Sequence, residues 1–306
     1  MKEEIQLQLI ERYEGCMLGL AIGDAIGTTV EFMPRGSFEP LDDMIGGGPF
    51  NLAKGQWTDD TSMALCLAHS LVECGGFDPL DQMKRYLMWR EEGYMSSKDN
   101  AFDIGGTTGD ALDEFSVTGN PYCGPSEISA SGNGSLMRLA PIPLYFRQER
   151  ELAIKMAGES SRTTHGSILC IEACRLFGAM LLDSLSGESK ESILLGHGLK
   201  DIASEEISEI ADGAYFEKPI SSIRGTGYVV ESLEAALWCF RNTDSFKEAV
   251  LLAANLGDDA DTTAAICGQI AGAYYGIGGI PQTWIDHIHH GRQIKRIAKK
   301  LLQANQ

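Results

Sequence analysis

The stretch Trp57-Thr58-Asp59-Asp60-Thr61 runs directly into the apolar segment 62–72, and this junction organises the chain. Two adjacent carboxylates beside a hydroxyl, at the start of a predicted helix, repel each other unless a proton or a cation is shared between them. A hard divalent cation relieves that repulsion and prefers oxygen ligands. The alternative is an N-cap, because acidic and hydroxyl side chains in a first turn satisfy free N–H groups and suit the helix dipole.

A second acidic stretch near the other end changes the balance between these two interpretations. It reads Asn255-Leu256-Gly257-Asp258-Asp259-Ala260-Asp261-Thr262-Thr263 and also precedes a predicted helix rich in small residues, 264–273. If folding brings the two clusters together, they supply enough oxygens for two cations roughly 3.5–4 Å apart, the spacing of two-metal hydrolytic sites. Two unrelated caps of similar composition remain the alternative, but the pairing favours metal.

Composition limits the class of partner. The chain has 306 residues, 43% of them hydrophobic, with 35 glycines and a formal charge of −18. This is typical of a packed globular protein. An acidic protein of this kind repels nucleic acid and anionic membrane surfaces, so we expect neither as a partner.

The eight cysteines include no Cys-x-x-Cys pair, and most lie in apolar helical segments. Cys170 and Cys174 share a helical face, but no second Cys/His pair completes a zinc site, so we interpret them as buried thiols. The amino terminus carries no signal-peptide pattern, and no apolar stretch is long enough to span a bilayer. We therefore expect a cytoplasmic location.

The remaining pattern predicts an all-α, single compact multi-helix domain over residues 1–306. Segment 4–27 reads as a helix whose glycines repeat every four residues, at 15, 19, 23 and 27, which lets another helix approach closely. Further helices are predicted over 58–74, 78–93 and 284–302, and in several segments between 149 and 255. Strand-like alternation is scarce, and the two acidic clusters belong to one site, so the chain is not divided.

Two glycine-rich loops and one histidine are candidate ligand contacts. Gly105-Gly106-Thr107-Thr108 and Gly132-Asn133-Gly134-Ser135 each run into an apolar or helical segment, where backbone N–H groups approach an anion without side-chain hindrance. His165 begins an apolar helical segment, and it is interpreted either as a structural hydrogen-bonding residue or as a ligand contact.

In this order, the motifs resemble the ADP-ribosylglycohydrolase family, which includes the dinitrogenase reductase-activating glycohydrolase and hydrolases of ADP-ribosyl-arginine and ADP-ribosyl-serine. The matching pieces extend from about residue 12 to 275. They are Gly19-Leu-Ala-Ile-Gly-Asp24-Ala-Ile-Gly27 with Glu31, Thr58-Asp59-Asp60, Asp103-Ile-Gly105, Gly132-Asn-Gly-Ser-Leu-Met-Arg138 with Pro141, Thr164-His165, and Gly257-Asp-Asp259-Ala-Asp261-Thr262.

The resemblance implies an all-α fold with a dinuclear Mg²⁺ or Mn²⁺ site. Its metal ligands, carried over by position, are Thr58, Asp59, Asp60, Asp259, Asp261 and Thr262; a slip of one residue would substitute Asp258. It places the ADP-ribose moiety near Gly105, Gly132, Asn133, Gly134 and Ser135, with His165 close by. Either Asp103 or Glu31 acts as general acid or base at the glycosidic bond.

The expected activity is hydrolysis of the N- or O-glycosidic bond of ADP-ribosylated protein side chains, with arginine favoured. Gly106 stands where some relatives carry asparagine, and Ala130 and Ser131 also depart from other relatives, which puts the leaving group in doubt. The alternatives are a free ADP-ribose conjugate or other nucleoside-type glycoside as substrate, and a catalytically silent crystallin-like relative. Because every acidic ligand position is filled, the silent relative is the least favoured.

Overall fold

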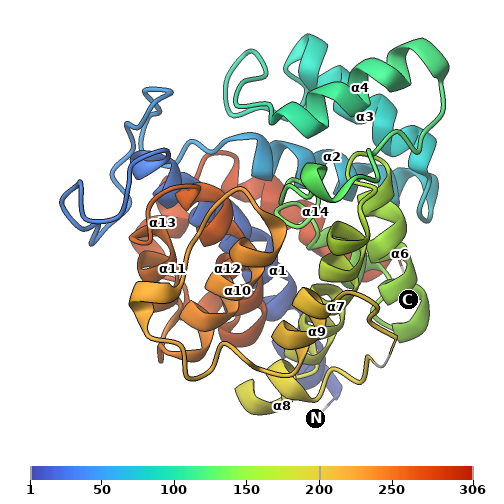
Figure 1. The fold of residues 1–306 in the computed structure, drawn as a ribbon. Helices are drawn as coiled ribbons and strands as arrows, with labels where there is room; N and C mark the ends of the chain where they lie inside the picture. The colour runs from blue at the N-terminus through green and yellow to red at the C-terminus, as the bar shows by residue number, and fades with distance from the viewer. Residues whose placement is uncertain (1, 200, 305–306) are drawn as a thin grey trace.

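Helix α1 (Lys2–Gly27) and helix α12 (Ala260–Tyr275) lie side by side in the middle of the molecule and form its most extensive helix pairing (Figure 1). Their backbones touch because both carry glycine at the contact. A Cβ placed on Gly19 would lie 2.1 Å from the carbonyl oxygen of Gly268, and one on Gly268 would lie 2.0 Å from that of Gly19. The glycine repeat of α1 therefore permits close helix packing, as predicted, and holds the start of α12 against the end of α1.

Gly19→Ala should destabilise the protein by about 3 kcal/mol or more, because the added methyl group forces the two backbones apart. Gly109→Ala is the matched control. Gly109 lies inside helix α4 (Gly106–Thr118), and an added Cβ would meet no atom closer than 3.9 Å. Because alanine favours helix, this control should stabilise the protein slightly or leave it unchanged. Urea denaturation measures both variants, and equal stability of Gly19→Ala and the parent would contradict the packing argument.

The computed structural model describes residues 2–199 and 201–304. Regular structure in these ranges is helical, and the β pairing consists of two isolated bridges, Gly47 with Leu52 and Gly132 with Tyr228. The remaining α-helices are α2 (Asp59–Cys74), α3 (Pro79–Glu92), α5 (Pro141–Tyr145), α6 (Arg150–Arg162), α7 (Ile168–Leu185), α8 (Lys190–Leu195), α9 (Glu205–Ala211), α10 (Val229–Arg241), α11 (Phe246–Ala254), α13 (Gln282–His287) and α14 (Gly291–Gln303). Short 3₁₀ turns cover Thr28–Val30, Ile128–Ala130, Ile220–Ser222 and Ile277–Gly279.

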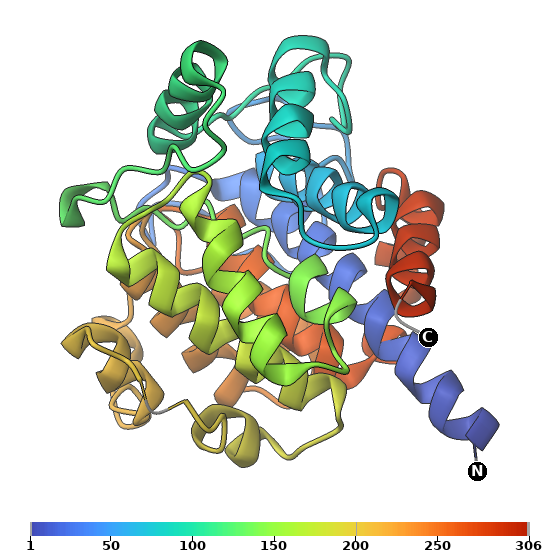
Figure 2. The ribbon, with the colours of Figure 1, turned by 90° about the vertical axis from the view of Figure 1, so that its right-hand side faces the viewer.

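Helices α3 and α4 stand to one side of the main helix bundle, as both ribbon views show (Figures 1 and 2). They share a separate hydrophobic cluster with α2, which includes Met63, Tyr86 and Phe115. The main core is built around α1, α7, α10 and α12. The smaller cluster matters for the site because it holds α4, whose first turn lies beside Gly132 and Gly134.

The all-α prediction is confirmed, and the predicted helices over 4–27, 58–74 and 78–93 correspond to α1, α2 and α3. The domain boundaries 1–306 stay a prediction. In the described part of the chain, no helix combines the length and the apolar character that a membrane crossing requires.

The prediction of one helix over 284–302 is wrong, because the chain breaks between α13 and α14. The backbone of His289 pairs elsewhere: its N–H donates to the Gly55 carbonyl at 2.8 Å, and its carbonyl accepts from the Trp57 indole at 3.1 Å. His290 then adopts a left-handed conformation, with φ of 54°. These partners are more than 200 residues away along the chain, so the local pattern does not reveal them.

Candidate active site

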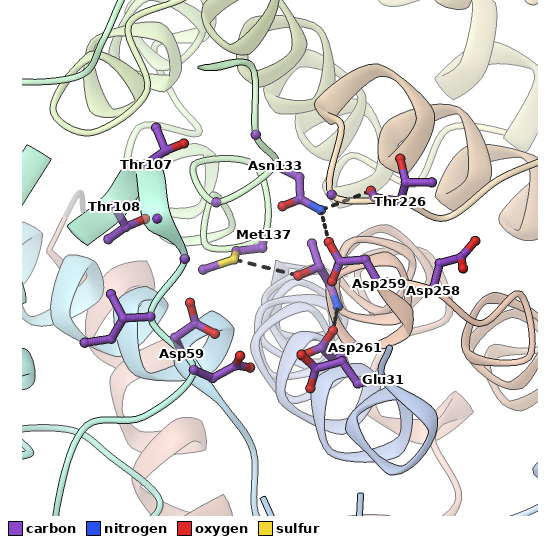
Figure 3. Close-up of a pocket in the computed structure, with 18 of the residues that line it drawn as sticks. Glu31, Asp59, Thr107, Thr108, Asn133, Met137, Thr226, Asp258, Asp259 and Asp261 are labelled. Carbon is purple, nitrogen blue, oxygen red and sulfur yellow. Dashed lines mark hydrogen bonds between the residues drawn. The ribbon is translucent and has the colours of Figure 1, made fainter. Parts of the chain in front are cut away.

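A cavity of about 730 Å³ opens where the N-termini of α2, α4 and α12 meet the loop that follows α1. Acidic side chains lie on one side of it, and glycine-rich segments lie on the other (Figure 3). The predicted site residues that line it are Glu31, Asp59, Asp103, Gly105, Gly132, Asn133, Gly134, His165, Asp259, Asp261 and Thr262. Thr58 and Asp60 are buried and lie directly behind this lining.

The N-terminus of α2 is capped by a residue from α1, and not by its own threonine or aspartates. The buried Asp24 carboxylate accepts hydrogen bonds from the N–H and hydroxyl of Thr58, both at 2.9 Å, and from those of Thr61, at 3.0 and 2.6 Å. Thr58 makes no side-chain cap bond. The N-cap interpretation of this cluster is therefore wrong. Asp24 accepts the hydrogen bonds from the free N–H groups of the helix start, so Asp59 and Asp60 are available for another role.

The second cluster is brought to the same place by a pair of backbone hydrogen bonds. Phe32 N–H donates to the Asp258 carbonyl at 2.7 Å, and Asp258 N–H donates to the Met33 carbonyl at 2.8 Å. Phe32 and Asp258 both have positive φ, at 64° and 56°. This pairing joins the loop after α1 to the start of α12, and so places Glu31 beside the second cluster.

Direct contacts connect the two clusters. The Thr58 hydroxyl lies 3.5 Å from Asp261 Oδ2, and the Thr262 hydroxyl donates to Asp60 Oδ2 at 3.4 Å. Asp259 has no side-chain cap bond either. Its Oδ2 accepts from the Asn133 amide at 2.7 Å, whereas Asp258 points away from the cluster (Figure 3). The structure therefore brings together the residues that the sequence pairs, and leaves Asp258 outside them.

Glu31, Asp103 and Asp261 each offer a carboxylate oxygen, and the three oxygens lie within 4.8 Å of one another. Burial, followed by the neighbouring Asp103 and Asp259 carboxylates, raises the pKa of Glu31 to about 9. Burial, followed by Asp24 and Asp259, raises the pKa of Asp103 to about 7. Asp103 also has φ of 61°, in the left-handed region that few non-glycine residues adopt.

These carboxylates fit a divalent cation. Burial and mutual repulsion raise the pKa values of Asp59, Asp60 and Asp261 well above the ordinary value. Asp60 Oδ1 is in addition buried without a hydrogen-bond partner. A cation would relieve the repulsion and satisfy this oxygen, and all the donors are hard oxygen atoms. The acidic cluster could therefore hold metal.

The opposite side of the cavity is formed by residues 132–134 and the start of α4. Asn133 connects this loop to the acidic cluster, because its amide donates to Asp259 and, at 2.8 Å, to the Ser232 hydroxyl. Ser135 does not line the cavity. Its hydroxyl instead accepts from Ser161 at 2.8 Å inside the protein, so it supports the loop from behind. The thiols of Cys170 and Cys174 are buried under the same loop, in line with their interpretation as structural cysteines.

Several lining residues are absent from the predicted set. Thr226 and Gly227 belong to a segment that reads as a polar connection. Long-range pairing brings it to the cavity, including the bond from the Asn133 N–H to the Gly227 carbonyl at 3.1 Å and the bridge between Gly132 and Tyr228. Thr107 and Thr108 follow a predicted anion-binding glycine pair, so the sequence does carry a signal for them. Phe32, Ile104, Gly106, Met137, Arg224 and Asp258 complete the lining.

The fold is all-α, and buried carboxylates cluster beside a glycine-lined cavity. Both features agree with the class of hydrolase that the sequence motifs predict. The family model for ADP-ribosylglycohydrolase matches residues 6–306. The chain therefore belongs to the ADP-ribosylglycohydrolase family, and it is a glycohydrolase. The family and its relatives named as hydrolases support an enzyme over the catalytically silent alternative.

Individual relatives agree with the family. The chain is 41% identical to ADP-ribosylarginine hydrolase Tri1 of Serratia proteamaculans, over 95% of this chain and 79% of that protein. It is 31% identical to the ADP-ribosyl-[dinitrogen reductase] glycohydrolase of Rhodospirillum rubrum, over 95% and 96%. A solved structure described as an ADP-ribosylglycohydrolase-related protein complex superposes with a TM-score of 0.86 at 40% identity, covering 98% of this chain and 99% of that one.

Proposed function

We propose that this glycohydrolase is metal-dependent and releases ADP-ribose from modified protein side chains, with ADP-ribosyl-arginine as its favoured substrate. The proposal rests on one observation: the acidic clusters 58–60 and 259–262 contact each other beside a cavity that glycines also line. Two divalent cations, Mg²⁺ or Mn²⁺, would be held by Thr58, Asp59, Asp60, Asp259, Asp261 and Thr262. When bound, such cations supply Lewis acidity and acidify coordinated water.

The cavity offers two kinds of contact to an ADP-ribosyl group. The backbone at Gly105 and at Gly132–Gly134 lets phosphate or ribose oxygens approach closely, because no side chain intervenes. The cluster of Glu31, Asp103 and Asp261 lines the same cavity, and there the glycosidic bond would be cleaved. The cavity volume of about 730 Å³ suits a nucleotide-sized ligand.

Asp103 is the proposed general acid, and it protonates the leaving atom as the glycosidic bond breaks. Its position favours it over Glu31. Asp103 leads through Ile104 into the segment that lines the substrate side of the cavity, whereas Glu31 accepts a hydrogen bond from Thr28 at 3.3 Å and lies beside the loop that carries Asp258. Glu31 therefore acts on the side where the cations would bind.

Arginine is favoured as the leaving group for two reasons. The Serratia proteamaculans relative is named as an ADP-ribosylarginine hydrolase. In addition, the cavity lining carries six acidic residues and one arginine, Arg224, so it complements a cationic guanidinium.

The test uses two peptides of identical sequence that carry ADP-ribose on arginine or on serine at the same position. We expect release of ADP-ribose from the arginine peptide with Mg²⁺ or Mn²⁺, and loss of release after chelation. Release from the serine peptide alone would overturn the choice of leaving group. Failure of both peptides, with ADP-ribose still bound, would instead favour a free conjugate as substrate.

A further inference from the structure

Arg138 is a fully buried cation without a carboxylate partner among the described residues. Its guanidinium lies over the Tyr86 ring, 4.6 Å from the centroid, and its Nε makes no hydrogen bond. The shortest bond it makes is from Nη2 to the Thr164 hydroxyl, at 2.7 Å. A buried charge is costly unless it is well paired, so this residue calls for an explanation beyond packing.

The Thr164 hydroxyl connects Arg138 to His165. It lies 2.8 Å from His165 Nδ1, and both residues are buried. A guanidinium has only donors, so the hydroxyl accepts from Arg138 and keeps its own proton to donate. His165 Nδ1 is the acceptor within reach. If Nδ1 accepts, a neutral imidazole must carry its proton on Nε2.

His165 Nε2 faces the glycine loop of the cavity. A Cβ placed on Gly132 would lie 3.3 Å from Nε2, and one placed on Gly134 would lie 3.1 Å from it. His165 itself lines the cavity. No hydrogen bond within the described part of the chain occupies Nε2, so its proton is available to a ligand that lies against this loop.

We propose that Arg138 is a positioning residue: acting through Thr164, it holds His165 as a neutral imidazole protonated on Nε2, which donates to an oxygen of the ADP-ribosyl group. The identity of that ligand rests on the proposed function. The chain of donors also strengthens the final N–H, because each hydrogen bond polarises the next. His165 therefore binds substrate as a donor and does not serve as a base.

The charge state of His165 agrees with this arrangement. Burial, followed by the Arg138 charge, lowers the pKa of His165 to about 3. A protonated imidazole would place a second cation beside the guanidinium and would also lose the acceptor that the Thr164 hydroxyl needs. The neutral form is therefore retained over the whole physiological pH range.

The test is long-range ¹H–¹⁵N correlation NMR of the full chain labelled with ¹⁵N-histidine, with the His165 signals assigned by their loss in His165→Gln. At pH 7 and at pH 5 we expect His165 to show a protonated Nε2 and an unprotonated, hydrogen-bonded Nδ1. Thr164→Val should move the Nδ1 signal to that of a nitrogen without a donor, or introduce the Nδ1-protonated form. A wild-type imidazolium, or a proton on Nδ1, would overturn the proposal.

Thr163→Val is the matched control. Thr163 is as buried as Thr164 and bonds Gln82 and Ser160. It also accepts a bond from Arg138 Nη2 at 3.5 Å, but it does not touch the imidazole, so it tests whether a hydroxyl beside Arg138 is sufficient without the link to His165. The His165 signals should therefore stay unchanged in this variant, and equal changes in both variants would overturn the relay. In calorimetric titrations, the dissociation constant of ADP-ribose should rise about tenfold in Thr164→Val and less than about twofold in Thr163→Val.

The two readouts separate this proposal from the proposed function. The NMR signature needs no substrate, so it can be present even if ADP-ribosyl peptides are not hydrolysed, and then only the proposed function fails. If the peptides are hydrolysed while His165 shows the other tautomer, only the relay fails. Circular dichroism of Thr164→Val and Thr163→Val confirms that both variants fold.

Discussion

Replacing Asp261 by asparagine should lower kcat/KM for release of ADP-ribose by about 10³-fold and abolish tight binding of divalent cations. Asp261 contacts Thr58 of the first cluster, and it shares a site with Glu31 and Asp103. It therefore lies where the two halves of the acidic cluster join. The asparagine amide keeps the size of the side chain but supplies no charge. Steady-state kinetics and calorimetric titration with Mn²⁺ measure the two effects.

Asp258→Asn is the matched control, three positions away. Asp258 has φ of 56°, a left-handed conformation that asparagine accepts, and its side chain points away from the cluster (Figure 3). Although Asp258 lines the cavity, this variant should keep activity within about threefold of the parent, because it keeps the size of the side chain and removes no ligand of the proposed cations. If Asp258→Asn loses as much activity as Asp261→Asn, the assignment of Asp259 and Asp261 as the ligand pair is wrong.

Asp103→Asn should lower kcat by about 10²- to 10⁴-fold with little change in KM, because a general acid acts in the transition state and not in substrate binding. Mn²⁺ affinity should be retained. Glu31→Gln should instead weaken Mn²⁺ binding. Its loss of kcat at saturating Mn²⁺ should be smaller than that of Asp103→Asn. The pair is measured in one assay with an arginine-linked substrate. Full turnover in Asp103→Asn would exclude it as the acid.

The sequence predicts the acidic site because its parts are local. Asp59, Asp60, Asp259 and Asp261 stand at two helix starts of similar composition, and helix starts are readable from short patterns. The glycine repeat of α1 is readable for the same reason, since glycine every fourth residue marks a face where another backbone comes close. The family resemblance then connects these pieces in order.

What the sequence does not reveal depends on contacts between distant residues. The cap of α2 comes from Asp24, 34 residues before Thr58. The sequence around Thr58 therefore does not show whether the helix is capped by its own residues or by a distant one. Asn133 is predicted as a ligand contact, but in the structure its amide bonds Asp259, 126 residues away. It therefore connects the two sides of the cavity. Ser135 matches the loop pattern but faces Ser161, because side-chain direction in an irregular loop is set by packing.

The central claim is that carboxylates from the two ends of the chain form one divalent-cation site that the reaction uses. Crystals of the full chain grown with Mn²⁺ test it most directly, through an anomalous difference map collected at the manganese absorption edge. We expect two peaks among Thr58, Asp59, Asp60, Asp259, Asp261 and Thr262, roughly 3.5–4 Å apart. The absence of peaks there, in crystals of protein whose hydrolytic activity requires Mn²⁺, would contradict the account.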